Sequence, residues 1–501
     1  NGKGGDIIID AKGDILTDDL FSLGSLGGGK ITLISGGTID FTQVDKSLNT
    51  PGGTISCAGV DTSCSGNGKG GNITFKATKD IITGEVNSSG SLGGGKIDIT
   101  STDGAVFTGL NSSSSGGDGG EISVKAPVKI TATGIKSTGN PGTGNITLTS
   151  NEINFSGAAN SVRGKGIIQL QPFTDSQNLN ISATDLTALA DGFSSIIIGS
   201  DNGSGFITIS NPFTFSDPTI IQSPSGAILV NAAIKGIDNA DITTIGNTNL
   251  NGNITTADRD ITVKGNTTLG NNVTISTGAN SGGDIKFNGT INGNRDLTLE
   301  AGTGNIAIDK AIGNNNRIGN LSINSATNVT TKDITAASII QKLGYGETSF
   351  GALNTNTLAG INLNGKNFRL DGKTTTTSGG TVTINNSGFV TIADTANMNL
   401  DGAFNQTGKG AVATAADITT TNDNISFSSP VTLKGNVALN TDKGAGDIKF
   451  ANTVDGGFDL NLTAGTGNIT IIGAVGSQTR IGNLTIDTVS YTHLRAHETS
   501  L

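Results

Sequence analysis

The chain has 501 residues, of which 76 are glycine, only 14% are charged and none is tryptophan. With only two histidines and two cysteines, it has few of the acids, bases and metal ligands that catalytic centres use. Its net charge is −10 and no cluster of Lys or Arg stands out, which argues against nucleic acid as a partner because phosphate binding needs a basic surface. No apolar run is long enough to span a membrane.

The first predicted elements are short strands that repeat through residues 1–155. Copies such as GGKITLISGGTIDF and GGEISVKAPVKI place an apolar residue after Gly-Gly and a polar residue, and another apolar residue two positions later. Alternation with period two predicts strands with one buried face. The leading apolar positions recur regularly along the chain, at Ile7, Ile31, Ile55, Ile73, Ile97, Ile122 and Ile146, with one shorter step between Ile55 and Ile73.

A fixed period of this length, about 24 residues, is typical of a solenoid, in which each repeat buries its apolar face on its neighbours. Three short strands with turns fit one repeat. We therefore predict an all-β fold, a right-handed parallel β-helix of about 20 coils. The leading isoleucines should point inward and stack, Asn and Thr can form ladders of hydrogen bonds, and glycine should serve the corners, where positive φ is needed.

The string GSLGGGKIT at 24–32 nearly matches the phosphate-binding loop G-x-x-x-x-G-K-[ST]. That loop needs a hydroxyl after the lysine to hold Mg²⁺, but Ile31 follows Lys30, and a second copy has Ile97 after Lys96. We interpret both strings as β-helix corners. Lys30 and Lys96 should then be exposed at equivalent corners, without an anion pocket.

Cys57 and Cys64 enclose six residues and are the candidates for a disulfide. In an exported protein they can close a small loop. The alternative is a buried thiol, because Cys57 occupies the inward plus-two position of its repeat. Both interpretations stay open at this point.

Two acidic turns, GGDGGE at 116–121 and DNGSG at 201–205, are candidates for calcium binding. The calcium-binding nonapeptide acts only when tandem copies stack, and here a single copy carries Glu121 in place of Asp. We interpret both as plain turns and predict no metal and no cofactor.

Residues 156–245 differ from the repeats on either side and are predicted to be β-helix with a decorated loop. Thr184 is a plausible N-cap for a short helix near 185–190, in which Leu186, Leu189 and Ala190 face inward. The flanking strings IIIGS, FITIS and TIIQS predict further strands.

Residues 246–488 contain a duplicated block. Residues 284–325 align without gaps to 447–488, and the similarity reaches upstream with one residue of slippage, so the copies span 254–325 and 418–488. Duplication by whole coils is tolerated in a solenoid because each coil contacts only its neighbours.

The tail at 489–501 holds both histidines, His493 and His497, with Glu498 next to the second. A zinc site needs a third protein ligand. The string also breaks the repeat after Thr488 and resembles translated sequencing-adapter sequence, so we expect a non-native tail that packs poorly.

The GGxIxI coils, the block DLTALADGFSSIIIGSDNGSG and the LTLEAGTGNIAI units resemble filamentous-haemagglutinin-like bacterial exoproteins over residues 1–488. The resemblance implies a very long β-helical protein, secreted or held at the cell surface. It also implies two-partner secretion through an outer-membrane transporter, and a host, cell-surface or glycan ligand. We therefore expect an internal fragment of such an adhesin, acting as an extended binding or display rod.

Two other functions compete with this prediction. One is a pure structural stalk that holds a distal domain away from the cell. The other is an enzyme that acts on polysaccharides, as some β-helices do. Such sites need converging carboxylates and usually aromatic platforms, whereas the acids here are scattered and aromatic residues make up 4% of the chain. We predict no catalytic residues.

Overall fold

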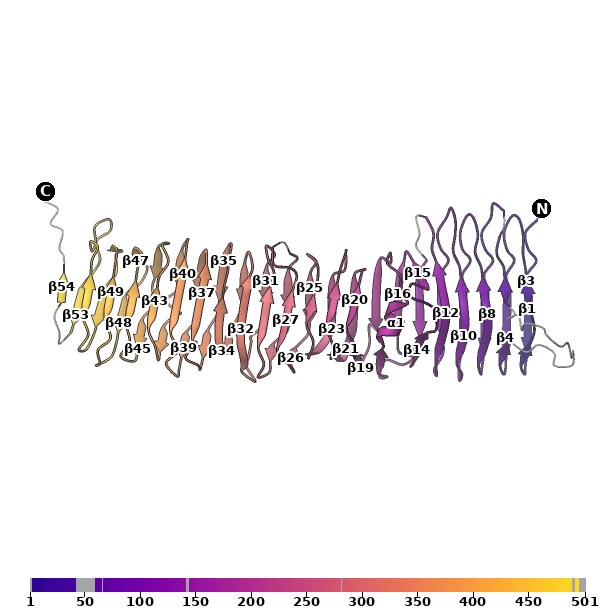
Figure 1. Ribbon diagram of the computed structural model, residues 1–501, viewed down its shortest axis with the longest axis horizontal. Helices are drawn as coiled ribbons and strands as arrows, with labels where there is room; N and C mark the ends of the chain where they lie inside the picture. The colour runs from indigo at the N-terminus through magenta and orange to yellow at the C-terminus, as the bar shows by residue number, and fades with distance from the viewer. Residues whose placement is uncertain are drawn as a thin grey trace. The chain divides into compact units, whose positions relative to one another are not determined.

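A computed structural model describes residues 2–41, 59–64, 66–140, 144–280, 282–488 and 492–494. Over these residues the chain forms 54 strands and one helix. It divides into two compact units, Asn1–Thr248 and Asn249–Leu501. Within each unit the strands pair in parallel, coil upon coil, as a β-solenoid with about 20 turns in all (Figure 1). The predicted all-β parallel β-helix is confirmed.

The first unit is organised around a ladder of isoleucines. It runs through the first strand of successive coils: β1 (Ile7–Ala11), β4 (Ile31–Ser35), β7 (Ile73–Ala77), β9 (Ile97–Ser101), β11 (Ile122–Lys125) and β13 (Ile146–Thr149). The leading isoleucines are register partners from each strand to the next. All are buried except Ile7, which is half-buried because β1 pairs only with β4 among the described strands. The predicted inward stacking is confirmed.

One step of the predicted series is wrong. Ile31 pairs directly with Ile73, so no coil starting at Ile55 stands between them. The extra chain enters between β5 (Ile39–Asp40) and β6 (Val60–Asp61). The GGTI string at 52–55 has the local pattern of a coil start, but Ile31 and Ile73 pair without a coil between them. Ile55 itself lies outside the described residues.

The duplicated block of the second unit has the same strand pairing at its core in both copies. β28 (Ile285–Phe287) pairs with β31 (Ile306–Ile308), and β49 (Ile448–Phe450) pairs with β52 (Ile469–Ile471) in the same register. Gly302 and its counterpart Gly465 both adopt left-handed backbone, at φ 54° and 48°. The copies therefore share a corner conformation that favours glycine.

A ladder of Asp and Asn side chains joins successive coil corners. In the second unit, Asn424 Oδ1 accepts from the backbone N–H of Asp447 at 2.8 Å, and Asp447 Oδ1 accepts from that of Asn468 at 2.7 Å. The duplicate positions Asp284 and Asn305 form the same bond at 2.8 Å. Each bond satisfies a backbone donor at a corner. The expected asparagine ladders are present, and Asp takes the same role.

The helix α1 (Ala183–Thr187) begins earlier than predicted, and Thr184 is not its cap. Ser182 is the N-cap and forms a capping box with Asp185, in which each side chain bonds the other residue's backbone N–H. That reciprocal arrangement satisfies two helix-end donors, which explains why the cap lies two residues before Thr184. Leu186 is buried as expected, and Leu189 is half-buried beyond the helix end.

The tail does not break the ladder at once. β54 (Thr492–Leu494) pairs in parallel with β52, with Ile469 opposite Thr492. The expectation that the tail lies outside the repeat is therefore wrong for these three residues. His497 and Glu498 lie outside the described residues. In the described part of the chain, no helix is long and apolar enough to cross a bilayer.

Candidate ligand-binding groove

The regular coil is interrupted on one sheet of the first unit. β10 (Val106–Asn111) lies between β8 (Ile81–Asn87) and β12 (Ile130–Ser137), and its register shifts against both, between Phe107 and Gly109. Each flanking strand carries one more residue than β10 there, which is the definition of a β-bulge. The bulges of neighbouring coils lie side by side and alter the direction of the side chains around them.

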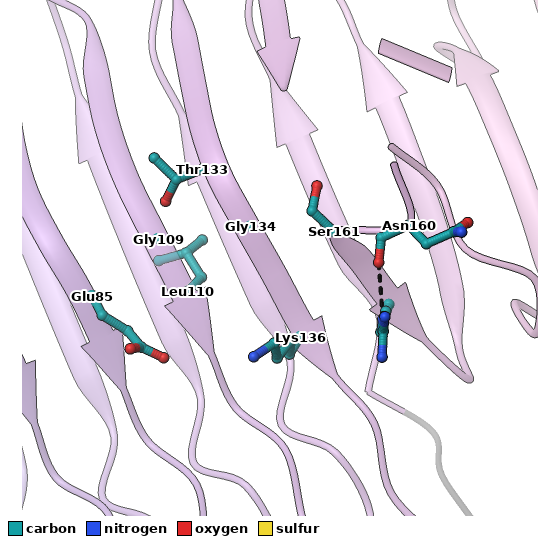
Figure 2. A pocket seen from close by; sticks show the side chains of 9 residues that line it. Glu85, Gly109, Leu110, Thr133, Gly134, Lys136, Asn160 and Ser161 are labelled. Atoms are coloured by element: carbon teal, nitrogen blue, oxygen red, sulfur yellow. Dashed lines mark hydrogen bonds between the residues drawn. The ribbon is translucent and has the colours of Figure 1, made fainter. Parts of the chain in front are cut away.

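The next coil adds a wall to this irregular region. A loop at 156–161 is inserted between β14 (Ile153–Phe155) and β15 (Val162–Gly164), which both pair with β12. A groove of about 410 Å³ lies over the bulged strands and against this loop (Figure 2). It is lined by Glu85, Gly109, Leu110, Thr133, Gly134, Lys136, Asn160, Ser161 and Arg163.

The floor of the groove is backbone. Gly109 pairs with Glu85 on one side and with Gly134 on the other, so two glycines follow the glutamate in this column of the sheet. A Cβ atom added at Gly134 would meet nothing closer than the Ser161 carbonyl oxygen, at 3.4 Å. The space above Gly134 is therefore open, and a side chain there would fill it without a clash.

Charged side chains stand at the edges of this floor. Figure 2 shows the Glu85 carboxylate and the Lys136 ammonium turned toward each other across β10, yet they form no ion pair within 4.0 Å. Lys136 is also the register partner of Arg163 on β15. The Arg163 Nε donates to the Asn160 carbonyl oxygen at 2.8 Å, which leaves the terminal nitrogens of the guanidinium for other acceptors.

Two further cavities adjoin the groove at Asn160. One, of about 730 Å³, lies between α1 and the strands β20 (Phe213–Phe215) and β22 (Ile234–Gly236), and Leu186, Leu189 and Phe213 line its apolar side. The other, of about 370 Å³, is lined by Arg163, Lys165 and Asp191 among others. Asn160 holds left-handed backbone at φ 60° where these cavities meet.

A buried carboxyl group, Asp217, lies close to this region. Its oxygens accept from the backbone N–H groups of Gly192 and Phe193 at 3.1 Å, and burial, with the nearby Asp191 carboxyl adding to it, raises the pKa of Asp217 above its ordinary value. The hollow beside it measures only about 30 Å³. Asp217 therefore fixes the turn at 191–193 and has no room for a sugar ring.

We expect the Asp217 carboxyl to make the unfolding free energy fall as pH rises. A folded-state pKa above the unfolded value means that Asp217 stabilises the fold most when protonated, below its unfolded pKa of about 3.9, and that this contribution is lost as pH rises through the folded pKa. In Asp217→Asn, which keeps an acceptor for Gly192, the contribution should be absent. Urea unfolding of both proteins between about pH 4 and about pH 8 measures it. If the wild type gained stability relative to the variant with rising pH, the hydrogen bonds would outweigh burial.

The phosphate-loop-like strings serve the corner ladder. The backbone N–H of Lys30 donates to Asp6 Oδ1 at 2.8 Å, and that of Lys96 to Asn72 Oδ1 at 2.9 Å. Both lysine side chains are exposed, as predicted, and Lys96 pairs with Glu121 of the next coil at 3.2 Å. The groove and cavities described above lie elsewhere.

The remaining candidates from the sequence do not converge on one site. Cys64 is buried, and Cys57 lies outside the described residues, so their disulfide stays a prediction. Glu121 is engaged by Lys96, and Asp201 Oδ1 accepts from the Gln222 amide at 2.7 Å. Among the described residues, no group of three or more His, Cys, Asp or Glu side chains is placed to hold a metal ion.

Sequence reasoning did not find the groove, although a signal for it exists. A Thr-Gly pair occurs inside three successive strands, at 83–84, 108–109 and 133–134. A glycine inside a strand pattern indicates a bulge or a close backbone approach.

Comparisons with known protein families, with curated protein sequences and with solved structures give no match for this chain.

Proposed function

We propose that this chain is a segment of a large bacterial β-helical adhesin, in which regular coils act as a rod that displays a binding groove. The observation that carries the proposal is the contrast within the first unit. The coils follow a constant register along the isoleucine ladder, whereas bulges and an inserted loop on another sheet open a groove with charged edges. A regular support with one local irregularity is an arrangement suited to display.

Placement at the bacterial surface or in the medium rests on the resemblance to filamentous-haemagglutinin-like exoproteins, and so does export through an outer-membrane transporter. The fold supports it in one respect. Its polar, glycine-rich corners and whole-coil duplication allow a solenoid to lengthen without redesigning its core, because each coil contacts only its neighbours. A longer solenoid would extend further beyond the cell surface.

The surface location gives a direct expected result. Antibodies raised against the purified chain should label intact cells of the bacterium that encodes it, or detect the parent protein in its culture medium. Protease added to intact cells should remove the cell-bound signal, while a cytoplasmic marker enzyme stays intact. A parent protein found only after lysis would contradict the proposal.

The stalk and the enzyme make different predictions for the purified chain. A stalk should bind neither host cells nor glycans. An enzyme should release reducing or unsaturated ends from acidic polysaccharides. The enzyme is the weaker alternative, because the Asp217 carboxyl group accepts from two backbone N–H groups and lies at a hollow too small for a sugar ring. We propose that the chain binds without catalysis.

A further inference from the structure

The cations of the groove lack the carboxylate partner that two lysines of neighbouring coils have. Lys96 pairs with Glu121, and Lys129 with Glu152 at 2.8 Å, so a lysine of one coil meets a carboxylate of the next. Lys136 instead meets Arg163 as its register partner, and neither forms an ion pair with any residue that the structure describes. Like charges directly opposite each other destabilise a sheet. An anion held between the two side chains would remove that repulsion.

The other polar groups of the groove are suited to hydrogen bonding with the hydroxyl groups of a ligand. The Glu85 carboxylate faces the floor from the opposite edge and accepts hydrogen bonds, while the Thr133 hydroxyl lies on the next strand but one (Figure 2). In the wall, the Ser161 Oγ atom is buried and has no hydrogen-bond partner among the described residues. Buried polar atoms normally have a partner, so a small shift of the wall that exposes this hydroxyl would let it bond a ligand.

We propose that this groove binds a carboxylate-bearing sugar chain of the uronate class. One carboxylate lies between Lys136 and the free end of the Arg163 guanidinium, whose fork matches a carboxylate with two hydrogen bonds. The ring lies on the backbone floor at Gly109 and Gly134, and its hydroxyls face Glu85. The expectation that the ligand lies on a host or cell surface rests on the proposed adhesin role. The binding site itself follows from the groove residues alone.

The Glu85 carboxylate determines which class of anionic ligand the groove can bind. It stands two strands from Lys136, about 10 Å across the sheet at the usual strand spacing, and two residues earlier along the strand direction, and it repels a second negative group on the ligand. Densely sulfated chains carry several negative groups on each short stretch of sugar rings. A uronate chain carries one carboxylate per ring among several hydroxyls, which suits cations at one edge and an acceptor at the other.

Isothermal titration of the full chain with a galacturonic acid pentamer tests the proposal. We expect saturable binding, with a neutral glucose pentamer and a heparin fragment both weaker. Lys136→Gln should weaken pentamer binding about tenfold, the scale of one charge-assisted contact. Gly134→Val should abolish it by filling the floor, and Arg163→Lys should weaken it by removing the fork while keeping the charge.

Matched variants keep the result interpretable. Lys129→Gln removes the same charge just before the start of β12, where Glu152 is its partner, and should leave the affinity unchanged. Gly13→Ala adds a side chain where nothing lies within 4 Å, and is the control for Gly134→Val. Equal melting temperatures would show that all variants fold. Absence of saturable binding, or equal losses in Lys129→Gln and Lys136→Gln, would overturn the uronate site. Neither outcome decides the adhesin role, which the surface-labelling experiment tests separately.

Discussion

Replacing Phe427 by alanine should destabilise the second unit by about 3–5 kcal/mol, the usual cost of removing a buried phenylalanine. Phe427 on β46 (Ile425–Phe427) is 1% exposed and lies between two other rings inside the coils. Its ring centroid is 5.2 Å from that of Phe404 and 5.2 Å from that of Phe450, and the second pair is stacked at 5°. The substitution therefore opens a cavity and removes both ring contacts at once.

The measurement is urea unfolding of the full chain followed by circular dichroism. Phe389→Ala is the matched control, because this side chain is 67% exposed in the same unit and its loss should change stability by no more than about 0.5 kcal/mol. Damage should stay near the altered coil, since a solenoid transmits strain through nearest neighbours. Hydrogen exchange should therefore quicken first in β43 (Phe404–Gln406) and β49. Equal losses in the two variants would show that the rings do not form the core.

Gly94→Ala should lower the unfolding free energy of the first unit by about 1–3 kcal/mol or more, as overpacking does. A Cβ atom at Gly94 would overlap the Ser112 carbonyl oxygen of the next coil and lie 2.6 Å from the Gly120 nitrogen. Both contacts are to backbone, which gives way only if the coils move apart. The glycine of this phosphate-loop-like string is thus required for coil spacing.

Lys96→Ala tests the other half of that interpretation. It removes only an exposed pair with Glu121, worth about 0–1 kcal/mol. Neither the wild type nor this variant should bind ATP saturably, and Lys30→Ala should behave in the same way. Thermal melting and a nucleotide titration measure the two effects. A stable Gly94→Ala, or ATP binding that is lost with either lysine, would favour a phosphate site.

The sequence by itself determined the solenoid. A regular period, strands with alternate apolar positions and Gly-rich corners predicted parallel coils, and the isoleucine ladder from Ile73 to Ile146 follows that period. The duplication likewise predicted matching strands, because identical local patterns produce identical corners. These features depend on short-range preferences that each repeat carries within itself.

Only the tertiary structure decided which repeats are neighbours. The GGTI string at 52–55 has the pattern of a coil, yet Ile31 pairs with Ile73. The chain between β5 and β6 is longer than in the other coils, and added length costs little, because loop-closure entropy grows only with the logarithm of loop length. The local pattern at Ile55 does not reveal which strand pairs with the strand of Ile31.

The groove was beyond sequence reasoning for the same reason. The separation of Lys136 and Arg163 along the chain matches no regular coil of the series. They become direct partners because the bulges in β8 and β12 and the loop at 156–161 absorb the surplus residues differently in each coil. A bulge shifts the register of every residue after it in the strand. Which charged residues lie opposite each other on adjacent coils therefore depends on the pairing of distant strands, and the sequence period does not determine it.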